Sequence, residues 1–365
     1  MKLSANHARA PRIRKYGWGL ALLLLAFTAS HCYAATYCIT AGDVVGLQAA
    51  LVDAANNSED DIIELQSGDY SMPSNFLLWY QAVAEFFDLT IEGGYGDNFG
   101  NPCGSPPAAP DPRLTVLDGG LFRIHLAGGA GSFTLKSVTV QNTFSTDVTD
   151  PPVEIGGYPN STGNVTIENS MFIGNGSTAK AAVYLFASQG ALSVYNSVFA
   201  TNVSFSSESP IRMGSQRTNG SFCGLIVNST FTSNAAAVPA VDLQTPMCSL
   251  IAANDIFWGN SASADVYIAV PDSTYVVNDD FGDLADAANT HAGELLSVDP
   301  LFNPDYSLRD LSPLRDKGNS GGAIFSPGSF DVIGNARTAG PSPDIGAFEI
   351  QDVIFAHGFD FQPPF

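Results

Sequence analysis

Basic residues are scarce in this sequence. Its 365 residues include 15 Lys and Arg against 36 Asp and Glu, which gives a formal net charge of −21 with His counted as neutral. This excess of negative charge repels the nucleic acid backbone and anionic membrane surfaces. Nucleic acid is therefore excluded as an expected partner, and the composition suits a soluble surface protein or one that takes up Ca2+.

The sequence also lacks an apolar run long enough to cross a bilayer as a helix, which takes ~20 residues. Residues 20–27 are apolar, follow five basic residues with no acidic one, and precede small residues up to Ala34. That order is typical of a secretory signal, so we expect cleavage after Ala34 and export of the chain without a transmembrane segment. A lipid-modified Cys32 is the alternative, but His31 stands where such signals require a small residue.

Cysteine is sparse, with five residues in all. Loss of the signal segment 1–34 removes Cys32 and leaves an even number, which in an exported chain indicates two disulfides. Three pairings are open, and we favour Cys38 with Cys103 and Cys223 with Cys248, since the second pair falls at similar places in consecutive repeats. Zinc binding is the alternative, but no Cys-x-x-Cys spacing supports it.

A short motif of the form Asn-Ser-x-Phe-x-x-Asn recurs along the chain. Its copies are KSVTVQN (136–142), NSMFIGN (169–175), NSVFATN (196–202), NSTFTSN (228–234), NDIFWGN (254–260) and NDDFGDL (278–284). Repeats separated by 20 to 50 residues indicate a solenoid, a propeller or an array. A propeller blade needs about 40 residues and four strands, which these repeats are too short to supply.

Apolar and polar residues alternate before each motif, as in a strand with one buried face. The sequence therefore predicts an all-β fold, a single right-handed parallel β-helix with one strand-walled coil per repeat. Its Phe side chains would stack inside the coil, while Asn tolerates the left-handed backbone of a sharp bend and donates from rung to rung. The predicted ladder consists of Asn169, Asn196, Asn228, Asn254, Phe172, Phe199, Phe231 and Phe257.

An open coil exposes strand edges, so both ends need a cap. Residues 43–57 have helical periodicity, and we expect this helix and the first rung at 61–70 to form an N-terminal cap over 35–70. Further early rungs are expected at 89–95 and 113–120. The segment 75–88, which holds Trp79, Tyr80, Phe86 and Phe87, is expected as an insertion packed over the open end of the coil. A sugar-stacking platform is the alternative.

The segments DIIELQSGDY, IEGGY and TVLDGG and the Asn-Ser-x-Phe repeats resemble those of bacterial exported right-handed parallel β-helix proteins. DPLFNPDYSLRDLSPLRDKGN (299–319) followed by PDIGAFEI (343–350) is similar to the closing part of choice-of-anchor Q domain proteins, with Lys317 where Ala is common. The resemblance implies one β-helix over 35–350 closed by 299–350, and it implies export but no agreed enzymatic activity.

The tail 351–365 contains IFAHGFD (354–360), which resembles a short ending of many exported gammaproteobacterial proteins. Two interpretations stay open: a sorting or surface-retention signal, or a strand that covers the last rung.

Candidate chemistry is confined to acidic residues near the end of the repeat. Glycoside hydrolysis needs two carboxylates at defined separation, and neighbouring rungs could supply them. The candidates are Asp255, Asp279, Asp280 and Asp283, and the last three could also bind Ca2+, although their spacing is not that of an EF-hand. His125 is expected to be structural, and no other cofactor is expected.

The first functional hypothesis is a secreted or surface-displayed structural or binding protein, adhesin-like or glycan-binding, with a polysaccharide or cell-surface partner. The alternative is a polysaccharide lyase or glycoside hydrolase that acts in a groove along the β-helix. Carboxylates on neighbouring rungs, in a groove with aromatic side chains, would favour the enzyme. A flat face lined by Ser, Thr and Asn would favour the structural role.

Overall fold

The computed structural model describes residues 34–351, apart from gaps at 83–85, 97–102, 105–109, 127–130, 219–221, 246, 261–262, 270–273, 286–289, 293–294 and 323–324. Apart from Ala34, the expected signal segment lies outside the described residues, and so does the tail segment 354–360. In the described part of the chain, no helix has the length and apolar character needed to cross a membrane.

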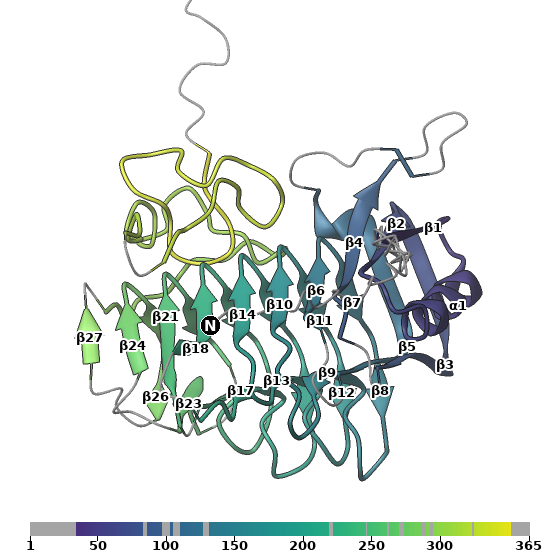
Figure 1. Cartoon of the computed structure of the whole chain (residues 1–365). Helices are drawn as coiled ribbons and strands as arrows, with labels where there is room; N and C mark the ends of the chain where they lie inside the picture. Colours follow the sequence, from purple (N-terminus) through teal and green to yellow (C-terminus); the bar gives the residue numbers. More distant parts are fainter. Residues whose placement is uncertain are drawn as a thin grey trace, which may run out of the picture. The chain divides into compact units, whose positions relative to one another are not determined.

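Parallel strands wind around one apolar core, which confirms the predicted all-β solenoid (Figure 1). One wall of the coil, here called wall A, is a sheet of ten parallel strands. In spatial order these are β1 (Ala35–Ile39), β2 (Asp61–Gln66), β4 (Leu89–Tyr95), β6 (Phe133–Lys136), β10 (Val165–Glu168), β14 (Leu192–Tyr195), β18 (Phe222–Val227), β21 (Ser249–Ala253), β24 (Thr274–Val277) and β27 (Thr290–Ala292).

Two further walls complete the coil. Wall B consists of β7 (Thr139–Gln141), β11 (Met171–Ile173), β15 (Val198–Ala200), β19 (Thr230–Thr232), β22 (Ile256–Trp258) and β25 (Asp280–Phe281). Wall C consists of β9 (Val153–Gly157), β13 (Val183–Ala187), β17 (Ile211–Ser215), β20 (Val241–Gln244), β23 (Val266–Ile268) and β26 (Leu284–Ala285). The short strands β8 (Phe144–Ser145), β12 (Gly176–Ser177) and β16 (Val203–Ser204) lie between walls B and C in the chain.

Two long strands join walls B and C near the N-terminal end. They are β3 (Gly68–Ala82) and β5 (Thr115–Leu126), which pair with each other. The 3-10 turn Pro112–Leu114 directly precedes β5. The first part of β5 pairs with β7 and its last part with β9. The expectation of an insertion at 75–88 is wrong in part, because Trp79 and Tyr80 belong to β3 and the Tyr80 side chain is buried in the core.

The motif Phe residues form one stacked column inside the coil. Phe172, Phe199 and Phe231 are paired in register on wall B, and Phe257 and Phe281 extend the column. Successive ring centroids lie 4.8, 4.8, 4.6 and 5.3 Å apart, with interplanar angles of 4–6°. The first four rings are fully buried. Each contributes about 1.5–3 kcal/mol of transfer free energy, so the column is a main source of stability.

The first Asn of each motif turns the chain from wall A to wall B. Asn169, Asn196, Asn228 and Asn254 have φ values of 46°, 45°, 51° and 59°, in the left-handed region that Asn tolerates. The Asn228 amide donates to Asn196 Oδ1 at 3.2 Å, and the Asn254 amide donates to Asn228 Oδ1 at 2.9 Å. The bend and part of the rung-to-rung bonding thus come from the same side chains.

A second ladder uses the last Asn of four copies of the motif, residues that the predicted ladder did not include. It consists of Asn175, Asn202, Asn234 and Asn260, joined by amide to carbonyl hydrogen bonds of 3.0, 3.0 and 2.8 Å. Each amide nitrogen also donates to a backbone carbonyl of the preceding coil. These bonds satisfy buried polar groups at the corner that follows wall B.

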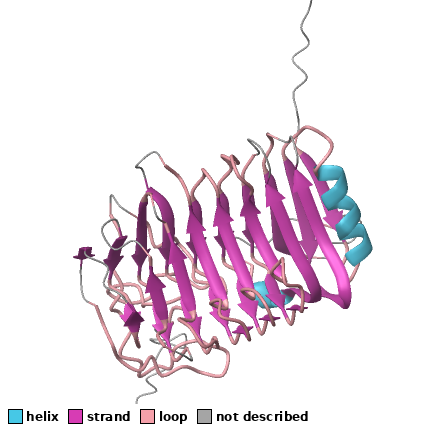
Figure 2. Ribbon diagram, turned by 90° about the horizontal axis from the view of Figure 1, so that it is seen from below, coloured by secondary structure: helices cyan, strands magenta, loops and turns pink. Residues whose placement is uncertain are grey.

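A helix and a strand begin the fold. The helix α1 (Val44–Ala54) is capped by Asp43, whose side chain accepts from the Gly46 N–H at 2.8 Å, and it buries Leu47 and Leu51 against the core. Figure 2 shows α1 in cyan at one end of the stack of coils. The chain enters wall A before this helix, because β1 pairs with β2, so the segment expected as the first rung is the second strand of the wall.

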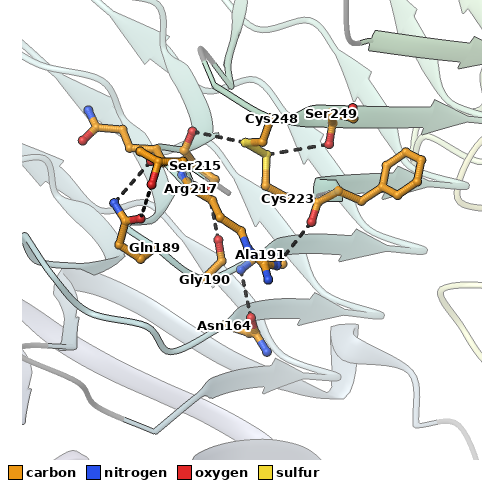
Figure 3. Close-up of a disulfide and its surroundings, with 12 residues drawn as sticks. Asn164, Gln189, Gly190, Ala191, Ser215, Arg217, Cys223, Cys248 and Ser249 are labelled. Atoms are coloured by element: carbon orange, nitrogen blue, oxygen red, sulfur yellow. Dashed lines mark hydrogen bonds between the residues drawn. A yellow bond between two sulfur atoms is a disulfide. The ribbon is translucent and has the colours of Figure 1, made fainter. Parts of the chain in front are cut away.

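Both disulfides join the cysteines favoured from the sequence. The Cα atoms of Cys38 and Cys103 lie 5.6 Å apart, and those of Cys223 and Cys248 lie 5.8 Å apart. Figure 3 shows the second bond, which joins Cys223 of β18 to Cys248, the residue just before the adjacent wall A strand β21. Such bonds are typical of an oxidising compartment and stabilise by roughly 2–4 kcal/mol each.

The closing segment, residues 299–351, has little regular structure and packs on the outside of wall B (yellow in Figure 1). Val332, Ala347 and Phe348 cover Met171 and Val198. The corner asparagines bind its backbone: the Asn228 amide donates to the Pro327 carbonyl at 2.7 Å, and the amides of Asn254 and Asn278 donate to the carbonyls of Asn319 and Lys317. Most of wall B is therefore covered.

Candidate functional site

Two of the predicted catalytic aspartates lie inside the coil. Asp255 and Asp279 are fully buried at the motif position that Ser occupies in earlier coils. Asp255 accepts hydrogen bonds from the N–H groups of Ser229 and Ala253 at 2.7 and 3.0 Å, and Asp279 accepts from the Asp255 N–H at 2.6 Å. Burial raises the pKa of both carboxyls well above the usual range, and Asp279 raises that of Asp255 further. A substrate outside the coil has no access to them.

The other two candidates do not join them in a cluster. Asp280 is buried and accepts from the Val298 N–H at 3.0 Å, and burial raises its pKa to about 6. The Asp283 side chain is exposed, while its N–H donates to Asp265 at 2.8 Å. Within the described ranges, no three His, Cys, Asp or Glu side chains gather closely enough to hold a metal ion.

A different set of side chains lines the outer face of wall C. Successive side chains of a strand point to opposite faces. On each strand of wall C two apolar side chains point into the core, so the side chain between them points outward. Register places these outward residues in one row across five strands: Glu154, Tyr184, Arg212, Asp242 and Tyr267. Charged and aromatic side chains thus follow one another along the coil axis.

This row lies in a shallow, continuous groove, here called the wall C groove. Hollows of about 430, 170 and 180 Å³ lie along it. The first two share Glu208 and Arg212, and the last two share Glu154 and Tyr184, so the hollows are contiguous. The groove is formed by Glu154, Tyr158, Lys180, Tyr184, Phe186, Glu208, Arg212, Asp242 and Tyr267.

Arg212 is the centre of a charged network in the groove. Its Nη1 lies 3.2 Å from Glu208 Oε2, and its Nε lies 3.6 Å from Asp242 Oδ2. The Arg212 Nη2 donates to Gln244 Oε1 at 3.2 Å, and its guanidinium lies 5.6 Å from the Tyr184 ring centroid. Burial raises the pKa of Asp242 despite the nearby arginine. The network holds the charged groups in fixed positions along the groove.

Aromatic rings supply the apolar part of the surface. The rings of Tyr184 and Phe186 are stacked with centroids 5.7 Å apart and an interplanar angle of 11°. Gly156 and Gly214 are the register partners of Phe186 on the two neighbouring coils, so no side chain flanks its ring there. Tyr267 is 37% exposed and Tyr158 is 41% exposed. These rings offer open platforms to a ligand.

His125 supports one end of the groove. Its Nδ1 lies 2.8 Å from the Tyr158 hydroxyl and its Nε2 lies 3.2 Å from Glu154 Oε2. The imidazole is buried and also packs edge-on against Trp79, with ring centroids 4.5 Å apart. His125 therefore positions two groove residues from beneath.

Comparison of the chain with models of protein families, with curated proteins and with solved structures finds no match. The resemblance to choice-of-anchor Q domain proteins accordingly stays a prediction. Function has to be inferred from the surface itself. The wall C groove is the better candidate site, because its polar and aromatic side chains line an open surface, whereas Asp255 and Asp279 are buried.

Wall A offers a contrasting surface. Its outward row includes Thr90, Thr134, Thr166 and Ser193, paired in register on consecutive coils. The row continues into Leu225 and Ile251, and the next outward row of wall A holds Glu92, Lys136, Glu168 and Tyr195. Wall A is therefore only in part the Ser- and Thr-lined face that would favour a structural role. The same coil thus carries a short row of hydroxyl side chains on wall A and a groove with aromatic and carboxylate side chains on wall C.

Stability should fall as pH rises from about 4.5 to 7. Burial raises the pKa of Glu349 to about 7 and that of Asp280 to about 6, so the folded state binds more protons than the unfolded chain in this window. The stabilisation is complete at a pH below the pKa values that these two carboxyls have in the unfolded chain. It is lost as the pH rises through the pKa values that they have in the folded protein. We expect a higher Tm at pH 5 than at pH 8, measured by calorimetry, and a smaller difference in Glu349→Gln. A higher Tm at pH 8 would contradict this.

Proposed function

We propose that this protein is a secreted or surface-displayed β-helix that binds a glycan along the wall C groove. The observation that carries the proposal is the row of five outward side chains in register, which brings three charged and two aromatic side chains together inside contiguous hollows. The two disulfides support an exported location.

The chemistry of the groove suits a sugar polymer. Aromatic rings pack against the C–H faces of pyranose rings, and carboxylate, guanidinium and phenol groups exchange hydrogen bonds with hydroxyls. The groove is open and shallow and extends across several coils, which fits an extended chain better than a small, enclosed ligand. Side chains already fixed by neighbours also lose little conformational entropy on binding.

Tyr184→Ala should weaken glycan binding at least tenfold, because Tyr184 lines two of the three hollows and contacts both Phe186 and Arg212. The measurement is affinity electrophoresis of the full-length chain against a panel of neutral and acidic polysaccharides. Thr166→Ala, an outward strand position on wall A, is the matched control and should bind as the wild type does. Equal weakening in both variants, or none in Tyr184→Ala, would refute the groove as the binding site.

An enzyme that cleaves the bound glycan is the second candidate. Glu154, Glu208 and Asp242 bring three carboxylates into one groove with aromatic side chains, and hydrolysis of glycosides uses such groups. Each of these carboxylates is engaged by a basic or imidazole side chain, which is why binding is the first proposal. Release of reducing or unsaturated ends from the polysaccharides that bind would establish catalysis.

A further inference from the structure

We propose that Glu208 makes the wall C groove selective for an uncharged glycan. The glycan chain lies parallel to the coil axis, with one sugar residue over each rung. This inference rests on the proposed glycan binding and adds the class of glycan, its direction and the residue that determines the selection.

Glu208 neutralises two cations at once. Its Oε1 lies 3.2 Å from Lys180 Nζ and its Oε2 lies 3.2 Å from Arg212 Nη1. The remaining contact of Arg212 with a carboxylate is to Asp242, at 3.6 Å. Glu208 itself is held in place, because its N–H donates to Ser206 Oγ at 3.0 Å. Both groove cations therefore have a carboxylate partner before any ligand arrives.

This arrangement disfavours an acidic glycan. A uronate that paired with Lys180 or Arg212 would have to displace Glu208, and two carboxylates would then compete for the same cation. The chain as a whole carries a formal charge of −21, which opposes a polyanion at longer range. The hydroxyls of a neutral sugar meet no such cost, because they can donate to the carboxylates and leave the ion pairs intact.

The row of outward residues sets the direction of the chain. Glu154, Tyr184, Arg212, Asp242 and Tyr267 come from five consecutive coils. Neighbouring parallel strands lie ~4.7–4.9 Å apart, a spacing comparable to the length of one pyranose residue in an extended glycan. A glycan along the axis would place one sugar over each rung, and its affinity should rise with length until about five residues are bound.

The test is isothermal titration calorimetry of the full-length chain at physiological ionic strength. The probes are neutral oligosaccharides, namely xylo-, cello- and galacto-oligomers from dimer to heptamer, and oligogalacturonates of the same lengths. The wild type should bind at least one neutral series, with affinity rising to about the pentamer and then levelling. The oligogalacturonate of equal length should bind at least tenfold more weakly.

Glu208→Gln releases Lys180 and Arg212 from the shared carboxylate, so its affinity for oligogalacturonate should rise at least tenfold. Glu92→Gln is the matched control, because Glu92 pairs with Lys136 on wall A at 2.9 Å and its loss changes the net charge equally. This control should bind oligogalacturonate no better than the wild type. The Glu208 side chain is 26% exposed, and the melting curve of each variant verifies that it folds.

The outcomes separate the two proposals. If oligogalacturonate binds the wild type as tightly as the neutral series and Tyr184→Ala abolishes that binding, the groove remains the site and the selectivity is wrong. The same holds if Glu208→Gln gains no more affinity for oligogalacturonate than Glu92→Gln. If no oligosaccharide binds the wild type or Glu208→Gln, glycan binding at the groove fails together with this inference.

Discussion

Phe231→Ala should lower the free energy of unfolding by about 3–5 kcal/mol. Phe231 is fully buried and lies in the middle of the column, with ring centroids 4.8 Å from Phe199 and 4.6 Å from Phe257. Its removal leaves a cavity that neighbouring coils cannot close, since their backbones are fixed by the parallel sheet. Unfolding in guanidinium chloride, followed by circular dichroism on the full-length chain, measures the effect.

The matched control is Phe205→Ala, in which the same ring is removed from a side chain that is 68% exposed. This substitution should change the free energy of unfolding by no more than about 0.5 kcal/mol. Comparable losses in the two variants would mean that the Phe column does not sustain the coil.

Arg337→Met should destabilise the protein by about 3–5 kcal/mol and release the closing segment. Arg337 is 1% exposed, and its Nη2 donates to the carbonyls of Asp344 and Gly346. The charges of Glu349 and Asp331 interact favourably with the buried guanidinium, so its loss removes the cation that offsets their negative charge. We expect faster proteolysis within 299–351 and a lower unfolding midpoint, with a smaller deficit at pH 5 than at pH 8.

Arg309→Met serves as the control, because the Arg309 side chain is exposed in the same segment. It should leave both the proteolysis rate and the midpoint close to the wild type. If Arg337→Met were as resistant to protease as Arg309→Met, the apolar contacts and the hydrogen bonds of the corner asparagines would hold the closing segment on the coil without Arg337.

The repeat made the coil predictable because the copies between residues 169 and 260 place the same side chains in the same local roles. The first copy, 136–142, is offset by one residue, since Val140 pairs with Phe172. Phe at the fourth position packs inward, and Asn at the first bends the backbone at positive φ, so spacing alone indicated stacked coils. The early strand β1 escaped prediction, since Ala35–Ile39 carries no copy of the motif and is recognised as a strand only through its pairing with β2.

The candidate site was harder to predict. Asp255 and Asp279 looked catalytic because acidic residues are conspicuous in a sequence, yet both replace a buried Ser that accepts a hydrogen bond from the neighbouring coil. The groove left a weaker signal: the strands VEI, VYL, IRM, VDL and VYI each hold one variable residue between two apolar ones. Only the register of wall C shows that these variable residues form a row.

Wall C also explains why Glu208 could not be recognised from the sequence. Its ion pairs join Lys180, which lies 28 positions earlier, to Arg212, which lies four positions later. Loop lengths between the coils vary, so the contact cannot be predicted from a fixed spacing in the sequence. The closing segment is a similar case, because the corner asparagines that bind it lie 65 and 99 residues before their partners.

The most direct measurement is a crystal structure of the full-length chain with the neutral oligosaccharide that binds most tightly. We predict a sugar chain in the wall C groove, parallel to the coil axis, with pyranose rings on Tyr184 and Tyr267 and with the Glu208 ion pairs intact. An oligosaccharide seated on the Thr-lined face of wall A, or lying across the coils of wall C, would contradict it.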